Sequence, residues 1–311
     1  AEKDLPANIC PLIKASYGYA KTDKCPYFHC SDLIVGETTC DGKKKMYEHL
    51  NEIKETYVMQ LPYKRDLEES HIFWKKSIEG LIDKLSVFYN VKITEKKLKE
   101  AIKLKNKRRK AVKEVYELMK SKPAKLSGKN LYKVINTSNY IFDDYRAIEL
   151  LNEFKNYVLN KQNKNTNKRI LLTGCPVGKA TEKVIDLIEK NGGNIVFFEN
   201  CTISKEKHNL VDESLEPIKA LTKHYLEIPC SVMSPNILRE ERIKEVLVDY
   251  KIDGVIDMTL QACHTYNIES RNISDLVEIK NNIPYIKIET DFSNTDTGQL
   301  STRLGAFIEM I

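Results

Sequence analysis

The chain of 311 residues contains eight cysteines, and their spacing is its first sign of chemistry. Cys10, Cys25 and Cys40 follow one another at equal intervals near the N-terminus, among turn-forming residues. Four more thiols are spread through the second half of the chain: Cys175, Cys201, Cys230 and Cys263. Because cysteine thiolates are the usual protein ligands of iron–sulfur clusters, this distribution predicts two sets of cluster ligands, one in each half.

Three of the cysteines are followed directly by proline, although the chain has only 10 prolines. The pairs are Cys10-Pro11, Cys25-Pro26 and Cys175-Pro176. A free cysteine on its own is most often a small buried apolar residue. A proline after the cysteine is typical of iron–sulfur ligation, so the repeated pair favours the cluster interpretation.

Disulfides and zinc explain the cysteines less well. A chain of this length can bury a core without disulfide bonds. Zinc sites use two closely spaced pairs, and here Cys25 and Cys30 form one pair without a second. The sequence shows no apolar leader and no apolar run long enough to span a bilayer. We therefore expect reduced thiols in a cytoplasmic protein with no membrane partner.

The net charge of +6 is distributed unevenly along the chain. Residues 91–130 contain 15 Lys or Arg and 4 Glu, a local excess of +11. No aromatic residues alternate with these cations at stacking positions, so we expect no nucleic-acid partner. The apolar residues of the segment recur with helical period, which predicts an amphipathic helix whose lysines face solvent or dock a partner.

The chain is long enough for two domains, and the polar and turn-rich stretch between residues 121 and 168 offers a boundary. We predict an N-terminal α/β domain at 1–165, which includes the basic helical segment at about 91–130. A second α/β domain is predicted at 166–311.

The second half alternates between strands and helices. Apolar, β-rich runs predict strands at 169–173, 194–198, 254–257 and 285–289. Helical patterns lie at about 177–190, 214–226, 238–250 and 270–280, and a closing helix begins near residue 299. This order is typical of a doubly wound, Rossmann-like or flavodoxin-like parallel sheet.

The first half repeats the pattern on a smaller scale. A strand at 33–36 leads to Cys40, and a helix at 43–53 and a strand at 57–61 follow. In the second half Cys175, Cys201 and Cys263 each follow a predicted strand, and Cys230 follows the short run 225–229. The carboxyl ends of parallel strands meet at one crevice. Two such domains would enclose a cofactor in the cleft between them.

Nucleotide-binding motifs are missing. Residues 174–181 imitate a phosphate-binding loop, but one residue is lacking between the glycines and the hydroxyl comes one position late. Pro176 also removes a backbone donor. No Gly-x-Gly-x-x-Gly follows a strand, so we expect no nucleotide to be bound by this chain.

The cysteine contexts resemble those of the 2-hydroxyacyl-CoA dehydratase and benzoyl-CoA reductase superfamily, and most closely its double-cubane cluster protein branch. The matching segments are 8–13, 23–28, 36–48, 173–176, 198–201, 228–236, 253–266 and 289–292. They cover almost the whole chain in order.

The resemblance implies a double-cubane [8Fe-9S] cluster, two [4Fe-4S] units that share a sulfide, with three thiolates to each unit. The three-cysteine site of the superfamily corresponds to Cys10, Cys40 and Cys263. The second unit is then assigned to Cys25, Cys201 and Cys230, and Cys175 stays nearby as a possible replacement. Cys30 is left out, because its apolar surroundings indicate packing.

The same resemblance implies an ATP-dependent, low-potential reductase, an oxidoreductase of anaerobic metabolism. A separate iron–sulfur ATPase would activate it by electron transfer, and it would reduce a small substrate. Glu37, His29 and His264 lie within four residues of proposed ligands and are candidate proton donors. A single gene product of this type is expected to form a homodimer.

Two other functions stay open. The first is a radical 2-hydroxyacyl-CoA dehydratase subunit with a single [4Fe-4S] cluster, although the extra thiols would then have no role. The second is a non-enzymatic electron-transfer iron–sulfur protein. The sequence does not identify the substrate.

Overall fold

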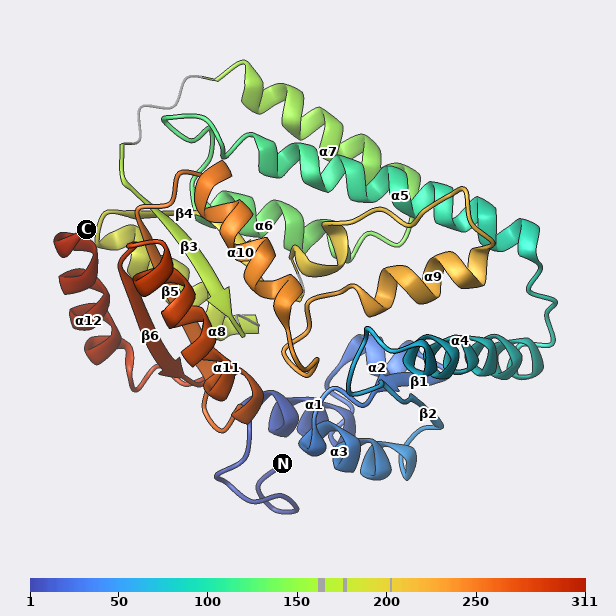
Figure 1. Ribbon diagram of the computed structural model, residues 1–311. Coiled ribbons are helices and arrows are strands. Elements are labelled where there is room, and N and C mark those ends of the chain that lie inside the picture. The colour runs from blue at the N-terminus through green and yellow to red at the C-terminus, as the bar shows by residue number, and fades with distance from the viewer. Residues whose placement is uncertain (162–165, 176–177, 202) are drawn as a thin grey trace.

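The computed structural model describes residues 1–161, 166–175, 178–201 and 203–311 (Figure 1). Within these ranges the chain forms two separate parallel sheets surrounded by helices. The α/β class predicted from the sequence, with two parallel sheets, is therefore confirmed.

The larger sheet has four strands in the order β4-β3-β5-β6. Its strands are β3 (Lys168–Gly174), β4 (Gly193–Glu199), β5 (Gly254–Leu260) and β6 (Tyr285–Thr290). All three strand pairings are parallel. The chain moves from β3 outward to β4 and then returns to the other side of β3 to form β5. The order in which the chain adds strands therefore reverses between β3 and β5, and doubly wound folds bind ligands at such a reversal.

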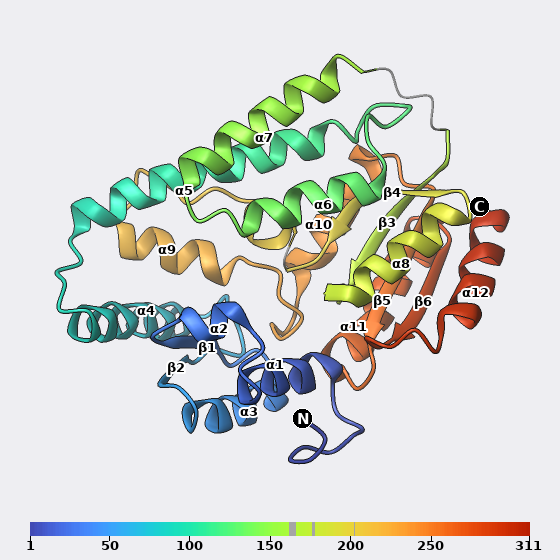
Figure 2. The same cartoon turned by 180° about the vertical axis from the view of Figure 1, so that it is seen from behind.

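Helices cover both faces of this sheet. They are α8 (Gly178–Lys190), α10 (Ile237–Asp249), α11 (His264–Ser274) and α12 (Thr297–Met310). α10 and α11 lie on the face seen in Figure 1, and α8 and α12 lie on the face seen in Figure 2. Because both faces are covered, every residue of β4 and β5 is buried, which explains their continuous apolar sequences.

The smaller sheet pairs β1 (Ile34–Glu37) with β2 (Thr56–Met59). α3 (Asp41–Asn51) connects the two strands, and α1 (Pro11–Lys21) packs against α3. This unit has its own small apolar core, which includes Ile13 and Leu50. The first half therefore repeats the strand–helix–strand pattern as predicted, with only two strands in its sheet.

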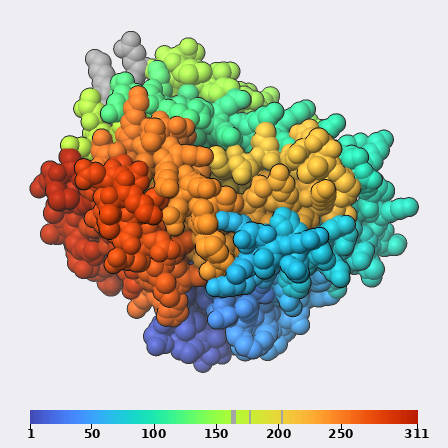
Figure 3. Space-filling view, in the orientation of Figure 1, coloured from blue at the N-terminus to red at the C-terminus, as the bar shows by residue number. Residues whose placement is uncertain are grey.

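The remaining helices are α2 (Pro26–Cys30), α4 (Glu68–Phe88), α5 (Glu95–Glu117), α6 (Gly128–Asn139), α7 (Asp144–Leu159) and α9 (Pro217–Leu226). Of these, α2 precedes β1, the four from α4 to α7 connect the two sheets along the chain, and α9 lies between β4 and β5. Two short elements complete the fold, a 3₁₀ turn at Lys205–Lys207 and a π-helix at Asp275–Lys280. α4 lies beside α9, so the N-terminal unit sits against the C-terminal half in the space-filling view (Figure 3).

α5, α6 and α7 share their core with the four-stranded sheet. Val115, Leu131 and Leu151, one from each helix, belong to the same buried cluster as the strand residues. The backbone N–H of Gly128 also donates a hydrogen bond to Asn194 Oδ1 on β4 (2.8 Å). The division at residue 165 stays a prediction, and residues 162–165 lie outside the described ranges.

The basic segment forms the amphipathic helix α5, as expected, but not all of its cations face solvent. Arg109 is buried and forms an ion pair with Glu206. Arg108 is also largely covered and pairs with Asp144 at the start of α7. These two arginines therefore fix α5 to its neighbours. Among the described helices, none is long and apolar enough to cross a membrane.

Candidate functional site

A cavity of about 810 Å³ lies between the N-terminal unit and the carboxyl end of the four-stranded sheet. Six of the eight cysteines line it: Cys10, Cys40, Cys175, Cys201, Cys230 and Cys263. We call this space the cysteine cavity. Thiols from both halves of the chain thus meet at one place.

Three of these thiols come from the sheet. Cys175 directly follows β3, Cys201 follows β4, and Cys263 follows β5. These three strands are parallel neighbours, so the three residues lie together at the carboxyl end of the sheet. Cys175 and Cys201 lie on one side of the point where the strand order reverses, and Cys263 lies on the other. The sequence prediction for these three positions agrees with the fold.

Close backbone packing fixes the position of Cys175. Its N–H donates a hydrogen bond to the carbonyl oxygen of Met258 on β5 (2.6 Å). Gly174, just before it, has φ +96°, and a Cβ there would lie 2.2 Å from the same carbonyl oxygen. Glycine is therefore required at this position. Pro176, which follows Cys175, lies outside the described residues.

Cys230 reaches the cavity by a different route from the one predicted. The run 225–229 was expected to behave like the strands before the other cysteines, but α9 continues to Leu226 and a turn follows it. Asn236 Nδ2 donates to the Cys230 carbonyl oxygen (3.0 Å) and holds this turn. A short apolar run does not distinguish a strand from the end of a helix, which explains the error.

Three cavity cysteines are helix N-caps: Cys10 on α1, Cys40 on α3 and Cys263 on α11. Cys40 Sγ accepts the backbone N–H of Lys43 (3.4 Å). The partial positive charge of a helix N-terminus stabilises a thiolate. The N-cap position of Cys10 also explains the proline that follows it, because proline is favoured at the first position of a helix.

Cys25 and Cys30 do not line the cavity. Cys25 caps the five-residue helix α2, where its Sγ accepts the Phe28 N–H (3.4 Å), and Cys30 at the other end of α2 is exposed. The structure thus brings together five of the six thiols proposed as ligands. Cys175 takes the sixth place, instead of Cys25.

Two cavity thiols interact directly. The Cys175 thiol donates to Cys263, which lowers the pKa of Cys263 to about 6 and raises the pKa of Cys175. Burial raises the pKa of Cys230 to about 11 and that of Cys10 in the same direction. The lowered pKa favours the thiolate form of Cys263 at neutral pH.

A network of buried charges lies behind the sheet-side thiols. Lys205 lines the cavity and forms an ion pair with Glu199 (2.9 Å), and both side chains are 1% exposed. Arg239, fully buried, bonds to Glu199 (3.1 Å) and to Thr173 Oγ1 (3.0 Å). Tyr266 lies between this network and Cys201. The network places a fixed cation at the cavity wall.

The three predicted proton donors separate in the structure. Glu37, at the end of β1, lines the cysteine cavity. His29 on α2 is exposed and pairs with Asp23 (2.8 Å), and His264 at the start of α11 is also exposed. Neither histidine is among the described residues that line the cavity.

Sequence reasoning missed Lys205 and Tyr266. Tyr266 follows Cys263 by three positions, which puts both on one face of a helix, but the sequence predicted that helix only from about residue 270, whereas α11 begins at His264. Lys205 had no signal in the sequence, because the irregular segment after β4 carries it to the cavity.

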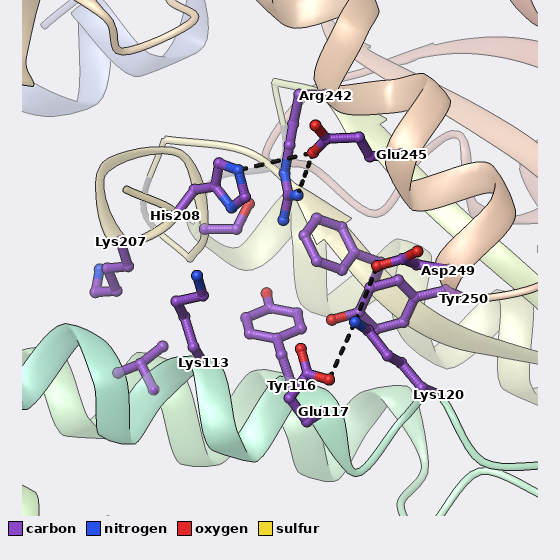
Figure 4. Close-up of a pocket in the computed structure, with 13 residues that line it drawn as sticks. Lys113, Tyr116, Glu117, Lys120, Lys207, His208, Arg242, Glu245, Asp249 and Tyr250 are labelled. Carbon is purple, nitrogen blue, oxygen red and sulfur yellow. Dashed lines mark hydrogen bonds and ion pairs between the residues drawn. The ribbon is translucent and has the colours of Figure 1, made fainter. Parts of the chain in front are cut away.

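A second pocket of about 190 Å³ lies between α5 and α10 (Figure 4). Figure 4 shows two ion pairs at this pocket: Arg242 bonds to Glu245 along α10 (3.0 Å), and Lys120, just past α5, bonds across to Asp249 on α10 (2.9 Å). No cysteine is among its described lining residues. In the described part of the chain, thiol chemistry therefore gathers in the larger cavity.

The six thiols surround a volume and do not converge on a point. Among the described residues, no three His, Cys, Asp or Glu side chains are placed to hold a single metal ion. Thiolates are soft ligands that suit iron–sulfur clusters. The donor set and the size of the cavity therefore fit a polynuclear group better than a single ion.

Comparison with known proteins places the chain in a family. Residues 1–311 match the family described as "HGD-D: 2-hydroxyglutaryl-CoA dehydratase, D-component". The chain is 47% identical to "Putative dehydratase subunit YjiM" of Escherichia coli (strain K12), across 100% of this chain and 82% of that protein. It is 23% identical to "(R)-phenyllactyl-CoA dehydratase beta subunit" of Clostridium sporogenes, across 100% of this chain and 83% of that one.

These matches confirm the resemblance to the 2-hydroxyacyl-CoA dehydratase superfamily that the cysteine contexts indicated. Both relatives carry the name of a dehydratase subunit, so the chain is a component of the dehydratase type. From its full-length match and its close relative, the chain belongs to the 2-hydroxyglutaryl-CoA dehydratase D-component family.

Proposed function

We propose that this chain is the reductase component of an ATP-dependent system and holds a double-cubane [8Fe-9S] cluster in the cysteine cavity. The observation that carries the proposal is the meeting of six thiols at one cavity. A single [4Fe-4S] cluster with three protein ligands would leave three of these thiols without a role.

The proposed ligand sets follow the fold. The first is that of the superfamily, Cys10, Cys40 and Cys263. For the second we replace Cys25 by Cys175, which gives Cys175, Cys201 and Cys230. Each set then combines thiols from separate segments of the chain.

When bound, the cluster would supply electrons of low potential to a small substrate. The chain itself has three tasks in this proposal. Helix N-termini stabilise the thiolates of Cys10, Cys40 and Cys263. The buried Lys205 offsets part of the negative charge of the thiolates. Glu37, exposed and at the cavity, is positioned to move a proton.

In this proposal the electrons come from a separate iron–sulfur ATPase, and two copies of the chain form a homodimer. The names of the family and its relatives support a multi-component system, since they describe a "component" and "subunits". They do not specify an activator or a second identical chain.

The second candidate function is dehydration of a 2-hydroxyacyl-CoA ester, a lyase reaction, with a single [4Fe-4S] cluster. The names of the family and of both relatives favour it. Counting cysteines favours the double cubane, because the lyase alternative needs only three of the six cavity thiols.

Metal analysis of anaerobically purified protein distinguishes the double-cubane cluster from a single [4Fe-4S] cluster. We expect about eight irons and a similar amount of acid-labile sulfide per chain. About four irons would contradict the double cubane and support the single cluster. A sample unfolded in a chelator and refolded without metal serves as the blank.

Activity assays then separate reductase from lyase. With the ATPase partner and a reductant, we expect ATP-dependent reduction of a small unsaturated molecule. Release of water from a 2-hydroxyacyl-CoA ester without net consumption of electrons would show the second candidate instead. If the chain accepts electrons but forms no product from any substrate tested, the result would support a non-enzymatic electron-transfer protein.

The exposed lysines of α5 are proposed to dock the ATPase. Lys103, Lys107 and Lys110 are exposed and form no ion pair with any residue that the structure describes. Reversal of all three to glutamate should slow ATP-driven reduction roughly tenfold at low salt, and added salt should narrow the difference. Arg108 and Arg109 should not be included, because their loss would disturb the fold.

The matched control reverses three exposed lysines on other surfaces, Lys64, Lys76 and Lys244. It changes the net charge by the same amount. Stopped-flow absorbance of the iron–sulfur chromophore gives the rate for both variants. Equal rates in the two would show that only overall charge matters and that α5 is a solvated face.

A further inference from the structure

One hydroxyl group touches the sulfur of a cavity cysteine. Tyr266 Oη lies 3.5 Å from Cys201 Sγ, within the range of a hydrogen bond to sulfur. Tyr266 is in the first turn of α11, and Cys201 lies just past the end of β4. The contact therefore joins two of the segments that line the cysteine cavity.

The second partner of this hydroxyl is a cation. Lys205 Nζ lies 3.1 Å from Tyr266 Oη. An ammonium group donates hydrogen bonds and cannot accept one, so the tyrosine oxygen must accept from Lys205. The proton of the hydroxyl is then free for a different acceptor.

Cys201 Sγ is that acceptor. A thiolate that binds metal has no proton to give, so Tyr266 must be the donor in this pair. Among the residues that the structure describes, the hydroxyl forms hydrogen bonds with Lys205 and Cys201 alone. The direction of both hydrogen bonds follows from the chemistry of the three groups.

The surroundings hold Tyr266 in this position. Two cations lie near its ring, with Lys205 Nζ 5.1 Å and Arg239 Cζ 5.0 Å from the ring centroid. Both cations are themselves bound to Glu199. The side chains of Tyr266, both cations and Glu199 are all buried, so water competes little for the tyrosine hydroxyl.

We infer that Tyr266 is a positioning residue: its hydroxyl, oriented by Lys205, donates a hydrogen bond to Cys201 Sγ and so sets the electron affinity of the metal group that Cys201 holds. The inference rests on the proposed function. Hydrogen bonds to ligand sulfur withdraw charge from the thiolate and favour the reduced state of a cluster. The pair of Lys205 and Tyr266 thus raises the reduction potential.

The test compares Tyr266→Phe with the wild-type protein and with Tyr140→Phe. Tyr140 also lines the cavity, but no hydrogen bond from its hydroxyl to a cysteine is present in the described structure. We expect all three to bind the same amount of iron. In an anaerobic redox titration followed by visible absorbance, only Tyr266→Phe should have a more negative midpoint potential.

The variant Lys205→Gln gives a second measurement of the midpoint potential, because Lys205 is the group that orients the Tyr266 hydroxyl. It keeps the tyrosine hydroxyl and removes the charge, and we expect a shift in the same direction. If Tyr266→Phe fails to fold, as seen by circular dichroism, Lys205→Gln is compared with Lys43→Gln, which removes another cation that lines the cavity. A larger shift in Lys205→Gln supports the inference, and equal shifts in the two variants would overturn it. A purely structural role of Tyr266 predicts lower thermal stability with an unchanged midpoint.

The outcomes separate this inference from the proposed function. Iron-loaded Tyr266→Phe with the midpoint of Tyr140→Phe and of the wild type would overturn the inference and leave the function intact. If the wild-type chain itself binds no iron, the proposed function fails, and the inference falls with it.

Discussion

Replacing Cys175 by alanine should remove most of the iron that the wild-type chain binds. Cys175 follows β3, at the point where the strand order reverses, and its thiol forms a hydrogen bond with Cys263. Loss of one of three thiolates leaves an iron atom without a protein ligand and exposed in the cavity. Iron and sulfide analysis of anaerobically purified protein, together with the visible spectrum, measures the effect.

Cys25→Ala is the matched control, because Cys25, like Cys175, is directly followed by proline. It does not line the cavity, so its alanine variant should keep the iron of the wild type. Cys30→Ala should behave in the same way. If Cys25→Ala loses iron and Cys175→Ala keeps it, the ligand set proposed from the sequence is right and our replacement is wrong.

Glu199→Gln should destabilise the fold strongly. Glu199 is fully buried between Arg239 and Lys205, and its neutral amide would leave two buried cations without their shared counter-ion. Removal of one partner from a buried ion pair costs about 3–5 kcal/mol. Urea unfolding of the metal-free protein, followed by circular dichroism, gives the change in the free energy of unfolding.

The exposed ion pair between Arg146 and Glu149 on α7 provides the control. Glu149→Gln should leave the unfolding curve nearly unchanged, since exposed pairs contribute little. A similar small effect of Glu199→Gln would show that the buried network does not hold the fold together.

The effect of Glu199→Gln should also depend on pH. Burial alone would raise the pKa of Glu199, but Arg239 and Lys205 together hold it below the ordinary value of 4.5. A lowered folded-state pKa contributes stability above pH 4.5, and this contribution is lost as the pH falls through the folded-state pKa. The difference between wild type and variant should therefore shrink below about pH 4.5.

The sequence predicted the second half of the fold well. Its strands are buried on both faces, so apolar runs such as 194–198 and 254–257 stand out against the charged helices between them. The N-terminal unit was harder, because its two strands are short and only partly buried. Its strand–helix–strand order was still visible.

The candidate site was only partly predictable. The family resemblance led to five of the six cavity thiols as ligands, and the position of Cys175 after a strand left it only as a possible replacement. The choice between Cys25 and Cys175 depends on where the short helix α2 lies, and sequence spacing does not determine this. The burial of Arg109 has the same origin: its partner Glu206 is far away in the sequence and meets it only in the fold.

The wide separation of the cavity thiols along the chain has a consequence for biosynthesis. Among the cavity thiols Cys10 leaves the ribosome first, and Cys263 leaves it last, only after the strand β5 has been made. Domains fold progressively from the N-terminus during synthesis, but no partial chain that ends before Cys263 holds all six thiols. In the proposed function, delivery of metal and sulfide to the complete set would therefore follow translation of Cys263, and until then the thiols made earlier would depend on an oxygen-poor, reducing environment.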